Sequence, residues 1–390
     1  MSISSSESKA IGLLRFSLII LIVFGHMRPN TVSIQASDFS LLSGHGISNV
    51  IAIVLSYLRI TNQAYFLISG YLFWQGMDGW DWNVFTRKIK TRSKTLLLPY
   101  VLWIVFSIGT FVALMLYQDI KAGASFSNIL EYLHGIGIKG FWNYHVWGLD
   151  KVDWLGNPSP NTAPFVLTLW FVRDLMVVTL FAPLLYWLFK KTKVWGILLL
   201  MFCYISKIWP QIDGFTIEAF SFFGLGLYIS MNGKTLVGVA EQLKIPAIIV
   251  SFFSFFACLY FGGNVTPIGR FIFPVFVISC IWIYIKIAEY ITKQKGFELA
   301  PFLAKSTFFI YLLHACPIAH IGSIMSKTNT IIYSVVHHIS APWLLYYLIS
   351  PFIIVAICLL IYYIMQRWTP KLCSLLTGSR MPKAEQSNTK

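Results

Sequence analysis

Apolar residues along this chain are gathered into long runs that short polar connections separate. The runs recur from Ile11 to Met365, and most are roughly 17–25 residues long, enough for one helix to cross a hydrocarbon core about 30 Å thick. This pattern predicts an all-α, polytopic integral membrane protein with about ten transmembrane helices. The predicted spans are residues 11–27, 62–76, 96–117, 164–189, 194–209, 216–231, 246–262, 270–291, 301–321 and 341–365.

Three stretches do not fit the pattern of full spans. Residues 47–58 are apolar but short, which favours a re-entrant or interfacial helix. The long connection 118–163 mixes aromatic and hydrogen-bonding residues, which suit either the faces and hydroxyls of a sugar or the headgroup region of a membrane. The third stretch, residues 367–390, is polar and basic, which predicts a disordered cytoplasmic tail. The predicted membrane domain covers residues 10–366.

Composition and charge sharpen this interpretation. The chain is 57% hydrophobic and only 12% charged, whereas a soluble domain is about one quarter charged. Its net charge of +15 is spread over the connections between spans, so no nucleic-acid partner is predicted. The basic residues favour the connections on the side of the N-terminus, which places both termini in the cytoplasm. The six cysteines show no CxxC spacing, and no metal site is predicted.

The first span carries two ionisable residues, Arg15 and His26. Eleven positions place both side chains on one face of a helix, about 16 Å apart along its axis. Arg15 could hold an anionic group that enters from the cytoplasm, and His26 could take a proton from a hydroxyl. The alternatives are an arginine that snorkels to the interface and an interfacial histidine without a catalytic role.

Two later spans also contain ionisable or polar side chains. Arg173 and Asp174 are neighbours, so they point about 100° apart, and we expect each to face another helix or a polar cavity instead of its neighbour. Tyr311 and His314 are three residues apart and share one face of a helix. This second pair could line an acceptor site or could form hydrogen bonds that hold the helices together.

The second span and the segment after it contain two further features. Ser69 and Gly70 would allow two backbones to approach closely. The basic segment before Pro99 includes Arg92 and Lys94, and it is either a signal for membrane orientation or a patch that binds phosphate.

Taken together, these segments resemble the family-3 membrane acyltransferases, bacterial enzymes that O-acylate glycans. Four motifs stand in the order typical of that family, and the resemblance covers almost the whole chain. A further segment, the basic loop after the second span, departs from the family pattern, because Arg92 matches its first arginine but Thr95 stands where a second arginine is usual. The matching segments are Arg15 to His26, Phe66 to Phe73 (FLISGYLF), Leu169 to Val172 (LWFV, which contains Trp170) and Ser306 to His314 (STFFIYLLH).

The resemblance implies that the chain transfers an acyl group, typically acetyl, from cytoplasmic acetyl-coenzyme A to a hydroxyl of a surface or lipid-linked glycan. It implies that Arg15, Arg92 and Lys94 engage the donor, which is a substrate and not a resident cofactor. It also implies that His26 is the catalytic base on a sugar hydroxyl or helps to relay the acyl group across the membrane. Ser69, Trp170, Arg173, Asp174, Tyr311 and His314 are candidates for a pore or acceptor side.

We expect the protein to lie in a bacterial inner membrane and to transfer the group directly to the acceptor. The alternative is a transporter or flippase for a lipid-linked saccharide, but such proteins often contain internal repeats and none is visible here. The identity of the acceptor, the length of the acyl group and the oligomeric state do not follow from the sequence.

Overall fold

The computed structural model describes residues 3–26, 60–123, 127–147, 161–210, 212–261, 266–314 and 342–378, and almost all of them are helical. The all-α prediction is therefore confirmed. The predicted helix at 47–58 lies outside the described residues. The α-helices are α1 (Ser5–His26), α3 (Thr61–Trp74), α4 (Trp82–Arg92), α5 (Leu98–Ala122), α6 (Ser127–Ile136), α7 (Trp170–Leu180), α8 (Ala182–Thr192), α9 (Val194–Ser206), α10 (Ile217–Met231), α11 (Leu236–Phe261), α12 (Pro267–Thr292), α13 (Pro301–Leu313), α15 (Pro342–Trp368) and α16 (Pro370–Leu376).

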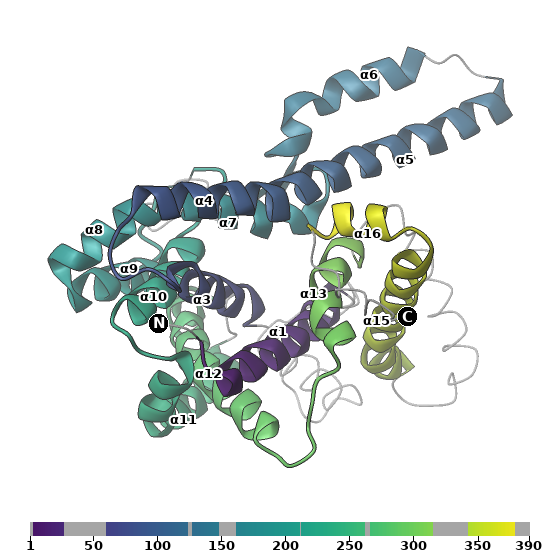
Figure 1. Cartoon of the computed structure of the whole chain (residues 1–390). Coiled ribbons are helices and arrows are strands. Elements are labelled where there is room, and N and C mark those ends of the chain that lie inside the picture. The colour runs from purple at the N-terminus through teal and green to yellow at the C-terminus, as the bar shows by residue number, and fades with distance from the viewer. Residues whose placement is uncertain are drawn as a thin grey trace, which may run out of the picture.

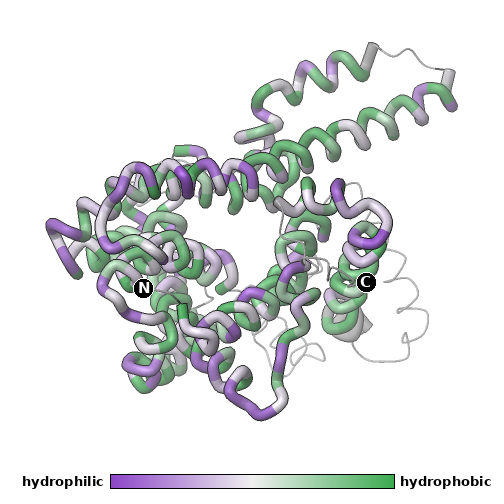
Figure 2. The backbone as a smooth tube through the Cα atoms, in the orientation of Figure 1, coloured by the Kyte–Doolittle hydropathy of each residue, from purple (hydrophilic) through white to green (hydrophobic). Residues whose placement is uncertain are grey.

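Within the described chain, five helical segments are long and apolar enough to cross a membrane, and a sixth is possible if the bent pair α7–α8 counts as one span. Helices α9, α10 and α13 are apolar but shorter. Figure 2 shows continuous hydrophobic stretches along α5 and α15 and hydrophilic residues in the connection between α12 and α13. Large apolar side chains such as Phe252, Phe253 and Phe256 of α11 are more than half exposed, which suits contact with lipid. The protein is a multi-pass membrane protein, with fewer full-length spans in the described residues than the ten predicted.

Helices α4 and α5 form one long helical segment with a π-helical turn, η2 (Ser93–Leu97), between them. Asp81 caps its start by accepting hydrogen bonds from the backbone N–H groups of Asn83 (2.7 Å) and Val84 (3.3 Å). Figure 1 shows this segment lying across one side of the molecule, with α6 folded back along the end of α5. The predicted span 96–117 is thus the middle of a longer helix.

The predicted single span 164–189 is instead a broken helix, because α7 and α8 meet at an angle of 57°. Pro183 stands in the first turn of α8 and lacks the N–H that a continuous helix would need. The first half of the broken segment, α7, carries Arg173 and Asp174, and both side chains are buried inside the protein.

Helices α3 and α10 touch through glycines. A Cβ atom at Gly70 would lie 2.0 Å from the carbonyl oxygen of Phe223, and one at Gly226 would lie 2.0 Å from that of Leu67. Each helix therefore has a glycine where the other backbone passes, and the predicted close approach at Gly70 is confirmed.

Helix α1 lies in the middle of the bundle and contacts α3, α12, α13 and α15. Its first turn is tied down by the buried carboxylate of Glu7, which accepts hydrogen bonds from the Tyr71 hydroxyl (2.9 Å) and from the backbone N–H of Leu236 (2.8 Å). The second bond satisfies an open N–H at the start of α11. This anchoring sets where Arg15 lies along the axis.

The prediction of a disordered tail from residue 367 is wrong for its first part. Helix α15 continues to Trp368, and α16 then packs on α5, where Trp103 Nε1 donates to the carbonyl of Leu376 (3.2 Å). Gly378 follows with a positive φ of 63° and lies against the backbone of Thr95. Residues 379–390 lie outside the described residues. The apolar residues of α16 bury against α5, which composition alone did not reveal.

The connection 118–163 is partly ordered. After α5 and α6 come the short 3₁₀ helix η3 (Gly137–Phe141) and a two-stranded antiparallel ribbon, β1 (His145–Trp147) and β2 (Asn161–Ala163), in which Val146 faces Thr162. A 3₁₀ turn, η4 (Leu167–Leu169), then leads into α7. Residues 148–160, which hold part of the predicted aromatic surface, lie outside the described residues.

Candidate active site

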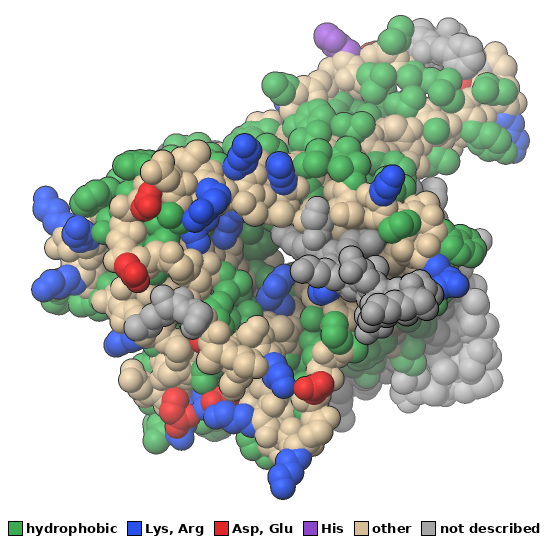
Figure 3. Space-filling view, in the orientation of Figure 1, with side chains coloured by type: hydrophobic (Ala, Val, Ile, Leu, Met, Phe, Trp, Pro, Cys, Tyr) green, Lys and Arg blue, Asp and Glu red, His purple; other side chains and the backbone are tan. Residues whose placement is uncertain are grey.

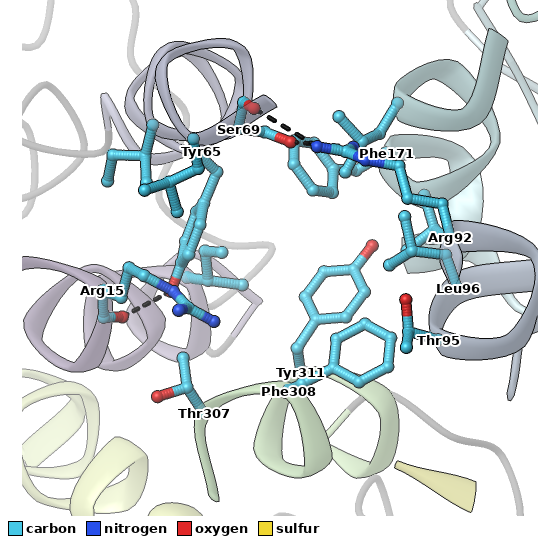
Figure 4. Close-up of a pocket in the computed structure, with 15 residues that line it drawn as sticks. Arg15, Tyr65, Ser69, Arg92, Thr95, Leu96, Phe171, Thr307, Phe308 and Tyr311 are labelled. Carbon is cyan, nitrogen blue, oxygen red and sulfur yellow. Dashed lines mark hydrogen bonds between the residues drawn. The ribbon is translucent and has the colours of Figure 1, made fainter. Parts of the chain in front are cut away.

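A cavity of about 280 Å³ lies between α1, α3, η2, α7 and α13. Its wall is apolar except for two guanidinium groups and a few hydroxyls (Figure 4). Within the described residues, no carboxylate lines it. An apolar cavity with uncompensated positive charge favours an anionic ligand. The lining residues are Arg15, Ile22, Tyr65, Ile68, Ser69, Leu72, Arg92, Thr95, Leu96, Phe171, Val172, Leu175, Thr307, Phe308 and Tyr311.

Arg92 is held against the wall of the cavity by three hydrogen bonds. Its Nη1 donates to Ser69 Oγ and to Thr179 Oγ1, both at 3.1 Å, and its Nη2 donates to the carbonyl oxygen of Ser69 at 3.3 Å. The guanidinium also lies 5.2 Å from the ring centre of Phe73. Since every one of these partners is neutral, the charge of Arg92 remains available to an anion.

Arg15 faces the cavity from the opposite side, on α1 (Figure 4). Its backbone carbonyl accepts a hydrogen bond from the Tyr65 hydroxyl, which links α1 to α3. Within the described chain, its guanidinium forms no ion pair with a carboxylate. Arg15 and Arg92, which are 77 positions apart in the chain, thus line the same cavity, as the sequence predicted for a donor site.

The turn η2 carries position 95, where the chain departs from the family pattern. Arg92, Thr95 and Leu96 line the cavity, whereas Lys94 is exposed on the outer side of the helix. A π-helical turn holds one residue more than an α-helical turn, and such turns are frequent at functional sites. The structure therefore does not bring Lys94 to the site, and the hydroxyl of Thr95 occupies the wall instead.

His26 and His314 lie side by side at the far end of α1. Their ring centres are 5.2 Å apart, with the planes tilted by 55°. His314 is buried, and its Nδ1 lies 3.0 Å from the carbonyl oxygen of Ile310. Because a carbonyl oxygen can only accept, Nδ1 carries the proton, and the lone pair of Nε2 has no hydrogen-bond donor among the described residues. His26 is exposed beside it.

Tyr311 connects the two regions. Its ring lines the cavity and lies 6.1 Å from the ring of His314, and its hydroxyl donates to the backbone carbonyl of Thr168. Of the two alternatives predicted for this pair, Tyr311 fulfils both: it lines the cavity and it forms an interhelical hydrogen bond. Tyr311 therefore lies between the cavity and the histidine pair.

Arg173 and Asp174 pair with each other, contrary to the prediction. Arg173 Nε donates to Asp174 Oδ1 at 2.9 Å, and the two side chains are only 2% and 0% exposed. The 100° between adjacent residues applies to their Cβ atoms, and the long arginine side chain folds back across it. Neither residue lines the cavity.

This buried pair ties the connections together. Arg173 donates to the carbonyls of Trp142 (2.6 Å) and Thr162 (3.1 Å), and Asp174 accepts a hydrogen bond from Thr216 Oγ1 (2.8 Å). Asp213 in turn accepts one from Thr162 Oγ1 (2.8 Å). We conclude that Arg173 and Asp174 hold the ribbon and the connection before α10 on the start of α7.

Two more sequence-selected residues have clear positions. Ser69 lines the cavity and accepts from Arg92, as described above. Trp170 begins α7 but does not line the cavity, whereas its neighbours Phe171 and Val172 do. Three residues of the cavity wall, Tyr65, Thr307 and Phe308, were not predicted from the sequence. Each lies inside or directly next to a matched motif, so a search within one helical turn of the motifs would have found them.

Comparisons with known proteins show the family of this chain. The acyltransferase domain family matches residues 8–364, so the chain belongs to that family. The chain is also 26% identical to the succinoglycan biosynthesis protein ExoH of Rhizobium meliloti (strain 1021), over 96% of this chain and 93% of that protein. No solved structure matches the chain. The protein is thus a membrane acyltransferase that transfers groups other than amino-acyl groups, as the motifs predicted, and the transporter alternative is not supported.

Proposed function

We propose that this protein transfers a short acyl group, with acetyl the first candidate, from acyl-coenzyme A to a hydroxyl of a surface or lipid-linked glycan. The observation that carries the proposal is an arrangement: Arg15 and Arg92 stand on opposing walls of one cavity, and Tyr311 lies between that cavity and the His26–His314 pair. We take this arrangement as the path of the acyl group. Positive groups suit the phosphates of the donor, and an imidazole suits proton transfer from a hydroxyl.

In the proposed reaction, the imidazole of His26 takes the proton of the acceptor hydroxyl. The hydroxyl oxygen then forms a bond to the thioester carbonyl carbon, and the carbon–sulfur bond breaks. The departing thiolate receives the proton, so that the products are an ester and free coenzyme A. His314 lies where the lone pair of its Nε2 can orient His26 or the acceptor hydroxyl.

Two further observations support the acceptor and the setting. The similarity to a protein of succinoglycan biosynthesis favours a polysaccharide or its lipid-linked precursor as acceptor. The apolar helices and the distribution of Lys and Arg favour a bacterial inner membrane, with the arginine end of the path toward the cytoplasm.

The test is acyl transfer by the purified protein in detergent, from radiolabelled acetyl-coenzyme A to an oligosaccharide. Loss of the general base typically lowers the rate by 10²–10⁴-fold, so we expect His26→Ala to abolish measurable transfer. His134→Ala, an exposed histidine on α6, is the matched control and should keep the wild-type rate. Wild-type transfer by a folded His26→Ala protein would contradict the assignment. Mass spectrometry of surface glycans with and without the protein would identify the acceptor.

A further inference from the structure

A second pocket, of about 320 Å³, lies where the ends of α3, α8 and α10 meet. Its floor is aromatic: Trp74 and Tyr186 stack with ring centres 5.2 Å apart and planes 17° apart. Its rim is polar and exposed. The rim residues are Asp78, Lys190, Lys193 and Asn232.

The two lysines give this pocket a positive rim. Lys190 Nζ lies 5.7 Å from the ring centre of Tyr186 and 5.1 Å from that of Trp187, which fixes the ammonium group beside the aromatic floor. Within the described chain, neither Lys190 nor Lys193 forms an ion pair with a carboxylate. Figure 3 shows that Lys and Arg side chains gather over α4 and around the end of α8, on a face where basic side chains outnumber acidic ones.

Lys193 holds a backbone conformation that few side chains adopt. Its φ is +53° and its ψ is −130°, in a region where glycine is usual, and its N–H closes the end of α8 by donating to the carbonyl of Phe189 (2.8 Å). Such conformations cluster at functional sites. Here the conformation directs the chain so that a lysine stands at the edge of the pocket.

A row of contacts joins this pocket to the cavity of the active site. Lys88 donates to the carbonyl of Gln75 (2.8 Å), and Gln75 donates to Ser230 Oγ (2.9 Å), next to the pocket wall. On the other side, Lys88 and Arg92 both lie against the ring of Phe73, at 5.6 Å and 5.2 Å. Positive charges therefore follow one another from the pocket to the cavity.

We propose that this pocket binds the nucleotide end of the acyl donor, with the phosphate of the ribose on Lys190 and Lys193 and the adenine against the aromatic floor. The proposal rests on the proposed function, since it takes coenzyme A as the donor. The diphosphate and the flexible pantetheine arm then run past Lys88 to the cavity, where Arg92 and Arg15 stand. Ser69 of the cavity and Trp74 of the pocket are five residues apart on α3, which is about 7.5 Å of helix.

An anionic lipid headgroup shares the phosphate chemistry of a nucleotide. The presence of Asp78 on the rim favours the nucleotide. A carboxylate opposes a bare phosphate, but it accepts hydrogen bonds from an adenine amino group or a ribose hydroxyl. The stacked aromatic floor likewise suits a flat heterocycle.

The experiment measures binding of adenosine 3′,5′-bisphosphate to the full-length protein in neutral detergent by calorimetry. We expect the double variant Lys190→Ala, Lys193→Ala to bind at least about tenfold more weakly, because two charge-assisted contacts to phosphate are lost. Lys191→Ala, an exposed neighbour outside the pocket, should bind like the wild type. Equal binding by the double variant and the wild type would overturn the proposal.

Two further measurements separate the possible outcomes. Phosphatidylglycerol in the detergent should not displace the nucleotide; displacement at equal or lower concentration would show a lipid site and overturn the proposal. In the transfer assay, the KM for acetyl-coenzyme A should rise about tenfold in the double variant with little change in kcat. If the wild type transfers acetyl but this KM is unchanged, only the nucleotide site is wrong. If the wild type does not use acyl-coenzyme A, the proposed function fails.

Discussion

Each arginine of the cavity is positioned by a different kind of contact. Three hydrogen bonds from two nitrogen atoms hold Arg92 to Ser69 and Thr179, and all of them use the planar fork of the guanidinium. Arg15 is positioned through its backbone, since Tyr65 binds its carbonyl and leaves the side chain to face the cavity. The positions of the two guanidinium groups therefore depend on these hydrogen bonds and not on charge alone.

We therefore expect Arg92→Lys to impair the enzyme although the charge is kept. A single ammonium group cannot reach Ser69 Oγ, the Ser69 carbonyl and Thr179 together, and the loss of charged hydrogen bonds costs about 1.5–3 kcal/mol each. The KM for acyl-coenzyme A should rise about tenfold or more in steady-state assays. Arg87→Lys, on the exposed side of α4, is the control and should not change it.

At the scale of elements, the contact between α3 and α10 keeps Ser69 in place. The backbones approach so closely that a methyl group at Gly70 or Gly226 has no room. The neighbour in each case is a backbone carbonyl, which cannot move aside like the end of a flexible side chain. The serine next to Gly70 is thereby presented to Arg92.

We expect Gly226→Ala to destabilise the protein by about 1–3 kcal/mol, the usual cost of overpacking. The measurement is the midpoint of thermal unfolding in detergent. Gly109→Ala on α5 meets no described atom within 4 Å and should leave the midpoint unchanged or raise it slightly. Equal midpoints for Gly226→Ala and the wild type would show that the helices can separate without cost.

Helix α16 braces the π-helical turn from outside. Gly378 lies against the Thr95 backbone, and Cys373 and Thr377 are buried. A chain that ends after residue 368 should lose about 1–3 kcal/mol of stability and part of its transferase activity, because the support of η2 is removed. A chain that ends after residue 378 keeps α16 and should match the full protein in unfolding midpoint and rate. Equal behaviour of both chains would exclude the bracing role.

At the scale of the whole molecule, the ends of α3, α8 and α10 share one face, which Figure 3 shows to be rich in Lys and Arg. The positive-inside rule predicts that this face and both termini lie in the cytoplasm. The histidine pair lies at the opposite end of α1 from its anchored first turn. A donor and an acceptor would thus approach from different ends of one path.

Fusions test this orientation. We expect green fluorescent protein at the C-terminus to fluoresce and alkaline phosphatase at the same position to be inactive, because phosphatase folds only outside the cytoplasm. Phosphatase joined after residue 125 should be active, because the positive-inside rule places the connection 118–163 outside the cytoplasm. The opposite pattern would reverse the sides proposed for donor and acceptor.

The sequence by itself determined the class of the protein and part of the site. Hydropathy is a local property, so apolar runs predicted a helical membrane protein without any knowledge of packing. Helical periodicity placed Arg15 and His26 on one face, and motif order linked them to Ser69, Arg92, Tyr311 and His314. Four of these six residues line the cavity, and the other two form the histidine pair.

Only the tertiary structure decided the rest. The bend after α7 and the pairing of Arg173 with Asp174 depend on where Trp142, Thr162 and Thr216 come to lie, and these residues belong to other segments. Thr95 lines the cavity and Lys94 lies outside it, because η2 packs against α7 with the face that carries Thr95. The order of α16 depends on burial against α5. These features arise from contacts between residues distant in the chain, and periodicity carries no information on such contacts.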